Sequence, residues 1–351
     1  METEKNLIPP QTLKGFQDLL PSQMIARTRL IEDIRTVYER YGFVPLQTPT
    51  LEYLSTLTGS GGEETNKQMF RLHSPEGDAI AMRFDLTVPF ARLVAQYPNE
   101  LKLPLRRYQI GSVFRADKPG PGRFREFTQF DIDAAGSESV AVDAEILAAM
   151  TEVMHRVGLR NDPDGAAQFR ISVNDRTVMN ALLVACQVTA EEQQKHVLRV
   201  IDKLQKIGLE HVRQELGNGR IDESGDPIRG VGLQAEQIDQ ILHVVAITGD
   251  SRRDVIARLA ALLPETPVSQ TALQEMHELA DALDALGVQE HDVVFDPSLT
   301  RGLDYYTGPV FEATLPAAPE FGSVMGGGRY NQLVERFLET PVPATGASIG
   351  I

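Results

Sequence analysis

The chain has 351 residues, 42% of them hydrophobic and 24% charged, so it is long enough for a large core and for two domains. Its net charge of -15 excludes a broadly basic surface, so any nucleic acid has to be bound by a local patch. Cys186 is the only cysteine and the seven histidines are scattered, which excludes an intrachain disulfide and argues against a dedicated protein metal site. The N-terminal residues lack a signal-peptide pattern and no apolar run has membrane-spanning length, so we expect a cytoplasmic protein.

The first predicted element is an amphipathic helix that starts at Pro21 and is stopped by Gly42. A strand over residues 43–49 follows directly. Pro49 has no amide donor and is tolerated best at a sheet edge. The segment is therefore predicted as an edge strand or as a contact with a partner subunit.

A polar, glycine-rich loop over residues 59–64 precedes a predicted strand pair, residues 69–72 and 80–84. Asp85-Leu86-Thr87 ends the second strand, and a helix begins after it. A carboxylate beside a hydroxyl at a strand end suits an ammonium group, but either side chain could equally cap the helix by accepting backbone amides. Both interpretations stay open at this point.

Residues 111–133 are typical of a long β-hairpin, because the Pro and Gly cluster at 119–122 interrupts two segments of alternating polarity. Basic and aromatic side chains are interleaved in it: Arg115, Arg123, Phe124, Arg125 and Phe127. Guanidinium groups pair with phosphate oxygens and an aromatic ring can cover a base, so the hairpin suits a nucleoside triphosphate. A surface hairpin with solvated arginines is the equally weighted alternative.

A helix over residues 139–157 and a strand over 169–174 come next. The character changes over residues 177–287, where apolar residues recur at helical spacing and Thr189-Ala190-Glu191-Glu192 has the pattern of a capping box. We predict an inserted helical module there, with residues 217–232 as a polar, glycine-rich connector.

Strand signals return over residues 292–295 and 309–313. Gly326-Gly327-Gly328 is predicted as a turn that leads into a helix over 331–338. Three glycines let the backbone approach a ligand closely, but they equally permit a tight turn without a ligand. Neither a P-loop nor a GxGxxG signature occurs in the chain. A nucleotide therefore has to be bound by arginines rather than by a glycine cradle.

Taken in order, these segments resemble the catalytic part of the histidyl-tRNA synthetases, which are class II aminoacyl-tRNA synthetases. Residues 13–18 and 41–52 resemble the N-terminal region and motif 1 of that family, and the hairpin resembles motif 2. Residues 301–308 and 326–330 resemble its two histidine-specific signatures. The resemblance implies an α+β fold, in which helices flank an antiparallel sheet. The helical module would be an insertion between the two parts of the catalytic core.

The resemblance also implies how the chain is divided. Residues 1–176 and 288–351 would form the catalytic core, and residues 177–287 the helical module. The rest of motif 3, with a further ATP-binding arginine, and an anticodon-binding domain would lie beyond Ile351. We therefore expect the chain to be a catalytic fragment.

Roles for single residues follow from the same resemblance. The residues implied in histidine binding are Asp85, Thr87, Gln129, Asp133, Arg301, Tyr305, Tyr306 and Tyr330. Those implied in ATP binding are Arg115, Asp117, Arg123 and Phe127, and the two catalytic arginines would be Arg301 and Arg115. Asp85 and Asp133 stand where many bacterial members have glutamate, but the carboxylate is kept.

The implied reaction activates L-histidine with ATP and Mg²⁺ to histidyl-adenylate and pyrophosphate, and then transfers histidine to the 3′ end of tRNA(His). The family also implies a homodimer, with Pro49 as a candidate interface residue. Two relatives without this activity are the alternatives: the regulatory subunit of ATP phosphoribosyltransferase and a sensing module in a regulatory kinase. Such relatives tend to lose the histidine signatures and the arginines of motif 2, both of which are complete here.

Overall fold

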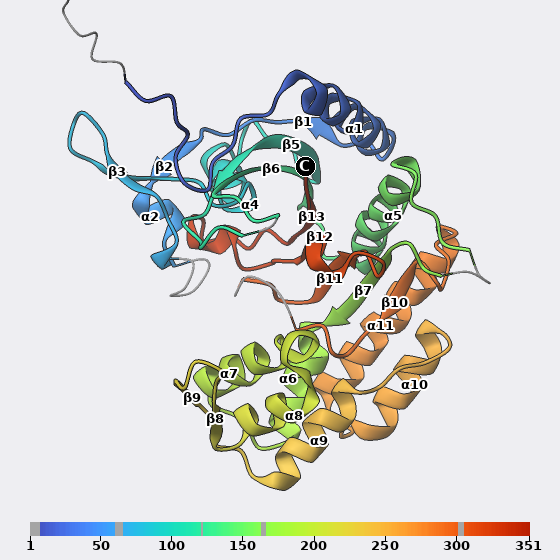
Figure 1. The fold of residues 1–351 in the computed structure, drawn as a ribbon. Coiled ribbons are helices and arrows are strands. Elements are labelled where there is room, and N and C mark those ends of the chain that lie inside the picture. The colour runs from blue at the N-terminus through green and yellow to red at the C-terminus, as the bar shows by residue number, and fades with distance from the viewer. Residues whose placement is uncertain (1–7, 60–65, 121, 163–165, 301–304) are drawn as a thin grey trace, which may run out of the picture.

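The computed structural model describes residues 8–59, 66–120, 122–162, 166–300 and 305–351. Within these ranges the chain forms an eight-stranded sheet flanked by helices, with a body of helices attached beside it (Figure 1). The strands, in their order across the sheet, are β1 (Val44–Pro45), β5 (Leu105–Phe114), β6 (Glu126–Ala135), β13 (Ala344–Gly350), β12 (Ser323–Arg329), β11 (Pro309–Thr314), β7 (Arg170–Asp175) and β10 (Val293–Phe295). Only the two outer pairs, β1 with β5 and β10 with β7, are parallel in this sheet, so the predicted α+β class is confirmed.

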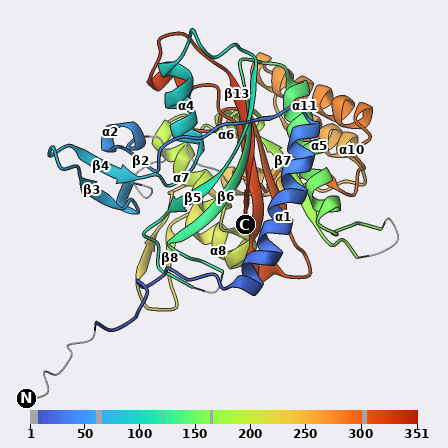
Figure 2. The ribbon, with the colours of Figure 1, turned by 90° about the horizontal axis from the view of Figure 1, so that it is seen from above.

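Helices α1 (Pro21–Arg40) and α5 (Val140–Arg156) lie together along one face of the sheet (Figure 2). Both were predicted from their apolar spacing. Strand β6 shows how the two faces differ, because successive side chains of a strand point to opposite sides. Phe130 and Ile132 are buried in the core under α1 and α5, whereas Gln129 and Asp133 face the opposite side of the sheet.

Strands β5 and β6 form the predicted hairpin, with antiparallel pairing from Leu105 opposite Ala135 to Phe114 opposite Glu126. Each strand has ten residues, so the hairpin extends to both sides of the predicted range. Its loop contains the Pro and Gly cluster, as expected for residues that cannot continue a ladder.

The segments before the hairpin form a small three-stranded sheet, β2 (Leu51–Tyr53), β4 (Ala79–Met82) and β3 (Arg71–His73), followed by helix α4 (Thr87–Gln96). The short helix α2 (Leu54–Leu57) lies beside it. The predicted strand pair is confirmed. The predicted edge strand is also confirmed as β1, but it is only two residues long and Pro49 lies after it, outside any strand.

The helical body is formed by α6 (Arg176–Ala185), α7 (Glu191–Ile201), α8 (Leu204–Leu216), α9 (Ala235–Val245), α10 (Arg252–Leu262) and α11 (Pro267–Ala285). The expected connector is in part a hairpin of its own, because β8 (Gly219–Ile221) pairs with β9 (Pro227–Arg229). The predicted capping box is wrong, since the residue before α7 is Ala190, which has no side-chain acceptor. None of the helices in the described ranges has the length and apolar character that a membrane crossing requires.

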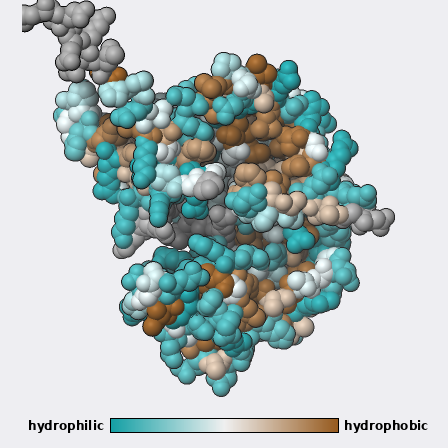
Figure 3. All heavy atoms as spheres, viewed as in Figure 1, coloured by the Kyte–Doolittle hydropathy of each residue, from teal (hydrophilic) through white to brown (hydrophobic). Residues whose placement is uncertain are grey.

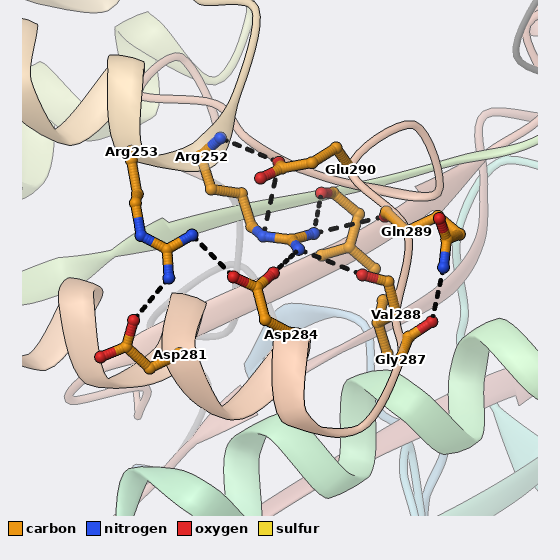
Figure 4. A network of polar contacts seen from close by, with 9 residues as sticks. Arg252, Arg253, Asp281, Asp284, Gly287, Val288, Gln289 and Glu290 are labelled. Carbon is orange, nitrogen blue, oxygen red and sulfur yellow. Dashed lines mark hydrogen bonds and ion pairs between the residues drawn. The ribbon is translucent and has the colours of Figure 1, made fainter.

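A buried arginine joins α10, α11 and the start of β10 (Figure 4). The guanidinium of Arg252 donates to Asp284 at 2.6 Å and to the backbone carbonyls of Val288 and Val293 at 3.1 Å, and its Nε lies 3.5 Å from a carboxylate oxygen of Glu290. Its charge is thus neutralised where it is buried, as a buried cation requires.

The glycine triplet differs from its prediction. It lies in strand β12 rather than in a turn, and the segment after it contains only a short 3₁₀ turn (Val334–Arg336) in place of the predicted helix. A Cβ on Gly327 would lie 2.1 Å from the carbonyl oxygen of Gly346 in the neighbouring strand β13. Glycine is therefore required here by close backbone packing within the sheet, and not by a positive φ angle.

Candidate active site

A cavity of about 820 Å³ opens on the face of the sheet opposite α1 and α5, with α7 of the helical body along its other side. Figure 3 shows a hollow between the two parts of the molecule, bordered by hydrophilic side chains. The following residues that the sequence singled out line the cavity: Asp85, Thr87, Arg115, Phe127, Gln129, Asp133, Tyr305, Tyr306 and Tyr330. Residues from four separated segments of the chain therefore line one cavity.

One part of the cavity is lined by Asp85, Thr87 and Gln129. One carboxylate oxygen of Asp85 accepts the Val88 amide at 3.0 Å, and the other lies 3.5 Å from the Tyr305 hydroxyl. The two interpretations of Asp85 are thus compatible, because it caps α4 with one oxygen and retains the second toward the cavity. Burial raises the pKa of Asp85 to about 6. The side-chain oxygen Oε1 of Gln129 is buried and has no hydrogen-bond partner among the described residues.

A second part of the cavity centres on Asp133. Its carboxylate accepts a hydrogen bond from the Tyr330 hydroxyl and lies 2.6 Å from Nη2 of Arg107. Burial raises the pKa of Asp133, while the Arg107 cation and the hydrogen bond from Tyr330 act in the opposite direction. The rings of Tyr305 and Tyr306 meet edge to face at 4.9 Å between centroids, and burial raises the pKa of both hydroxyls, which keeps them protonated. These phenols are therefore available as hydrogen-bond donors.

Arg115 marks the third part of the site. Its Nε donates to the Phe84 carbonyl at 3.1 Å, and its guanidinium carbon lies 5.1 Å from the centroid of the Phe127 ring. Arg115 and Phe127 also line a neighbouring cavity of about 740 Å³, which contains the other two predicted ATP residues, Asp117 and Arg123. The predicted ATP residues are thus grouped, and two of them connect the two cavities.

The floor of the main cavity includes backbone of β12 and β13, with Gly326, Gly327 and Gly346 among its lining residues. A Cβ on Gly346 would lie 2.2 Å from Oδ1 of Asp133. Glycine at this position therefore leaves the space that the Asp133 carboxylate occupies, which the sequence pattern alone does not indicate.

Sequence reasoning missed Arg107, which is buried beneath the cavity opposite Asp133. The register of the hairpin pairs Arg107 with Asp133 and would have indicated its role. The sequence alone does not determine this register, because the loop between the two strands is long and irregular. It also missed a group of basic residues from the helical body that line the cavity: Arg176, Lys195, His196, Arg199 and Lys203.

Two predicted residues are not part of this geometry. Arg301 lies outside the described residues. Pro49 lies away from the cavity, where its carbonyl accepts a hydrogen bond from Arg83 at 3.2 Å. In the part of the chain that the structure describes, no three His, Cys, Asp or Glu side chains gather in a way that could hold a metal ion.

Comparisons with known proteins identify similar sequences. A sequence profile described as Histidyl-tRNA synthetase matches residues 15–351. A histidine–tRNA ligase of Paracoccus denitrificans is 41% identical over 97% of this chain and 71% of its own length, and one of Rhizobium meliloti is 43% identical over 96% and 68%.

Solved structures give the same result. The crystal structure of histidyl-tRNA synthetase from Nostoc sp. PCC 7120 has a TM-score of 0.81 and 34% identity, covering 98% of this chain and 74% of that one. A Bacillus halodurans protein described as an ATP phosphoribosyltransferase regulatory subunit/histidyl-tRNA synthetase has a TM-score of 0.79 but only 26% identity, over 97% and 81% of the two chains. The regulatory-subunit alternative is therefore not favoured. The chain belongs to the histidyl-tRNA synthetase family.

Proposed function

We propose that the main cavity binds histidine and ATP side by side, and that the chain performs there the histidine–tRNA ligase reaction of its family. The observation that carries this proposal is the combination of unsatisfied acceptors and fixed donors in one cavity. Gln129 Oε1 has no partner among the described residues, Asp85 keeps one oxygen toward the cavity, and Arg115 lies further along the same wall. A cationic group and an anionic group are thus accommodated in one place.

The ammonium group of histidine would bind between Asp85, Thr87 and Gln129. An ammonium has three donors and no acceptor, so it complements the carboxylate oxygen, the hydroxyl and the amide oxygen of this group. A buried amide oxygen without a partner costs about 1–3 kcal/mol, and a bound donor would remove that cost.

The imidazole ring would bind between Asp133 and the tyrosines Tyr305 and Tyr306, with Tyr330 closing the pocket. Neutral imidazole offers one N–H donor and one nitrogen acceptor. The Asp133 carboxylate would accept from the N–H, and a phenol hydroxyl of Tyr306 would donate to the other nitrogen. A pair of this kind distinguishes histidine from amino acids that lack a donor and an acceptor at these two positions.

ATP would bind along Arg115, with Arg123 and Asp117 reaching it from the hairpin loop and the Phe127 ring covering the adenine. We assign Arg301 to the reacting carboxylate and the α-phosphate on the family resemblance alone. Mg²⁺ would enter as the counter-ion of the ATP phosphates, where it neutralises charge. The contribution of the chain itself is the set of positioned guanidinium groups.

In the first step, a carboxylate oxygen of histidine forms a bond to the α-phosphorus of ATP, and the bond to the bridging oxygen of pyrophosphate breaks. The attacking carboxylate is already ionised at neutral pH, so this step needs no protein general base. It needs alignment of the two substrates and compensation of phosphate charge, and Arg115 is placed to supply both. In the second step a ribose hydroxyl at the 3′ end of tRNA(His) displaces AMP from the adenylate.

The tRNA and the second subunit extend the proposal. The basic residues that line the cavity in α7 and just after it, among them Lys195 and Lys203, suit the negatively charged acceptor end of a tRNA despite the acidic chain as a whole. We further propose a homodimer.

The test is histidine-dependent exchange of labelled pyrophosphate into ATP, measured with the full-length protein. We expect exchange with L-histidine and none with glutamine or phenylalanine, which cannot form both ring contacts. An absence of exchange with histidine, under conditions where a known histidyl-tRNA synthetase is active, would contradict the proposed function.

A further inference from the structure

Arg107 is a fully buried cation that does not itself line the cavity. Its side chain is 0% exposed and that of its partner Asp133 is 2% exposed. Removing a charge from water is costly unless a partner and hydrogen bonds compensate, so a buried arginine on an inner strand of the sheet has to be explained by its contacts.

Those contacts join two separate parts of the histidine site. Nη2 of Arg107 lies 2.6 Å from the Asp133 carboxylate and donates to the backbone carbonyl of Leu86 at 3.0 Å. Leu86 stands between Asp85 and Thr87, the two residues assigned to the ammonium group. The guanidinium carbon also lies 4.6 Å from the ring centroid of Phe90 on α4, which holds the plane of the side chain.

We propose that Arg107 is a positioning residue for histidine recognition, which holds the Asp133 carboxylate ionised and at a set distance from the Asp85–Thr87 segment. This inference rests on the proposed function of the cavity. It adds that Arg107 sets the distance between the residues that would bind the imidazole ring and those that would bind the ammonium group. Because one guanidinium contacts both Asp133 and the Leu86 carbonyl, a change at Arg107 alters the distance between these two parts of the site and the charge of the imidazole acceptor together.

The charge of Asp133 matters because only an ionised carboxylate accepts at both oxygens. Protonated Asp133 would carry a donor that competes with the imidazole N–H. The charged and titratable groups that act on Asp133 come from several elements: Arg107 from β5, Asp131 from β6, Asp85 from the segment before α4, Tyr38 from α1, and Tyr306 and Tyr330. Arg107 is the cation in direct contact with the carboxylate among the described residues.

The experiment compares Arg107→Gln and Arg107→Lys with the wild type in the full chain, by calorimetric titration with histidine and with ATP from pH 6 to 9. For Arg107→Gln we expect the Kd for histidine to rise about tenfold or more, with the Kd for ATP unchanged, because a buried ion pair is lost at the site of one ligand only. The pH above which histidine binds should also move upward, since Asp133 loses its cation. The imidazole of free histidine titrates equally in all samples, so it cancels from the comparison.

Arg107→Lys keeps the charge but loses the planar contact with Phe90 and the second hydrogen bond. We expect a smaller rise in the Kd for histidine, and a pH dependence like that of the wild type. If Arg107→Gln does not fold, the lysine variant carries the test, and an unchanged Kd for histidine in it overturns the proposal.

Arg252→Gln is the matched control. Arg252 is also buried and paired with an aspartate at 2.6 Å, but in the helical body (Figure 4). Its replacement should lower the melting temperature while the Kd for histidine stays at the wild-type value. An equal loss of histidine and ATP binding in Arg107→Gln would overturn the positioning role, because it would indicate a general disturbance of the sheet. A wild type that binds no histidine would instead contradict the proposed function itself.

Discussion

Asp85 illustrates how one residue serves fold and site together. It caps α4 through the Val88 amide and presents its second oxygen to the cavity. Capping alone would be served equally by asparagine, which is as good an N-terminal cap as aspartate. Capping therefore does not explain why the residue is negatively charged, whereas binding of an ammonium group would explain it.

We predict that Asp85→Asn raises the KM for histidine about 10- to 100-fold, which corresponds to the loss of a charge-assisted hydrogen bond of about 1.5–3 kcal/mol. The KM for ATP should stay the same, and so should the melting temperature, because the cap is kept. Pyrophosphate exchange at varied histidine and ATP concentrations measures the two KM values, and thermal unfolding measures the melting temperature.

The same variant has a predicted pH dependence. Burial raises the pKa of Asp85 to about 6, so the wild-type carboxylate is ionised above that pH and protonated below it. The ratio of the KM for histidine in the variant to that in the wild type should therefore be largest above pH 7 and approach one below pH 5. A ratio independent of pH would show that the Asp85 charge does not bind the ammonium group.

Much of the site was predictable at the residue scale, and the exceptions have a common cause. Arg115 is indicated by its residue type within the hairpin pattern, whereas Gln129 and Asp133 were predicted from the family resemblance. Arg107 is not marked in that way, because its importance comes from the residue opposite to it on the neighbouring strand. Cross-strand partners depend on register, which a long irregular loop leaves open.

At the scale of elements, an N-terminal segment supports the hairpin loop, which carries two of the proposed ATP-binding residues, Asp117 and Arg123. The amide of Arg125 donates to the Gly15 carbonyl at 2.7 Å, and Nη1 of Arg125 reaches the Lys14 carbonyl at 3.4 Å. Phe16 contacts Phe70 edge to face, with 5.9 Å between ring centroids. The segment is thus held between the hairpin loop and the small sheet.

Gly15 is required at this contact for two reasons. Its φ angle is +87°, which side-chain-bearing residues rarely adopt, and a Cβ would lie 2.8 Å from Pro119 and 2.9 Å from Arg125. We predict that Gly15→Ala displaces the hairpin loop and raises the KM for ATP several-fold, with the KM for histidine unchanged. Pyrophosphate exchange at saturating concentrations of each substrate in turn measures the two values.

Gly77→Ala is the control for this prediction. Gly77 has a similar φ angle of +95°, but a Cβ there would meet nothing within 4 Å. The alanine should therefore cost about 1–2 kcal/mol of stability from backbone strain alone, without a change in either KM. A normal KM for ATP in Gly15→Ala would mean that the segment does not position the loop.

Element prediction succeeded where local pattern decides and failed where tertiary packing does. The hairpin, α1 and α5 follow from alternation or helical spacing, and the structure contains all three. The local sequence of the glycine triplet predicts a turn, but the triplet lies in a central strand. Glycine is needed there because β13 packs too closely for a side chain at Gly327. That requirement comes from a strand later in the chain.

For the whole molecule, the α+β class could be predicted, but the order of strands could not. β13 lies between β6 and β12, so the last strand of the chain completes the floor of a cavity whose walls come from much earlier segments. Such an arrangement leaves no local trace in sequence. We propose that the helical module is separate from the catalytic core, although α11 connects the two. This helix belongs to the helical body, and it also packs against α5, the helix that covers the sheet.

The outer surface of β2 indicates where a second subunit would bind. Leu51 and Tyr53 point outward and are 45% and 60% exposed, whereas Glu52 between them points inward and pairs with Arg92. This is the reverse of the usual pattern, in which apolar residues face the core and charges face water. Val44 on the edge strand β1 is also half exposed. Both β1 and β2 therefore expose apolar side chains.

We predict that the wild type is a dimer at micromolar concentration and that Leu51→Lys with Tyr53→Lys shifts it to a monomer, because two cations would be buried at the interface without partners. Sedimentation velocity measures the change. Leu262→Lys on α10, a residue 41% exposed on the helical body, should leave the dimer intact. A wild-type monomer would contradict the homodimer, and a double variant that still sediments as a dimer would place the interface elsewhere. Since β2 pairs with β4, which leads directly into Asp85, the monomeric variant should also bind histidine more weakly than the dimer.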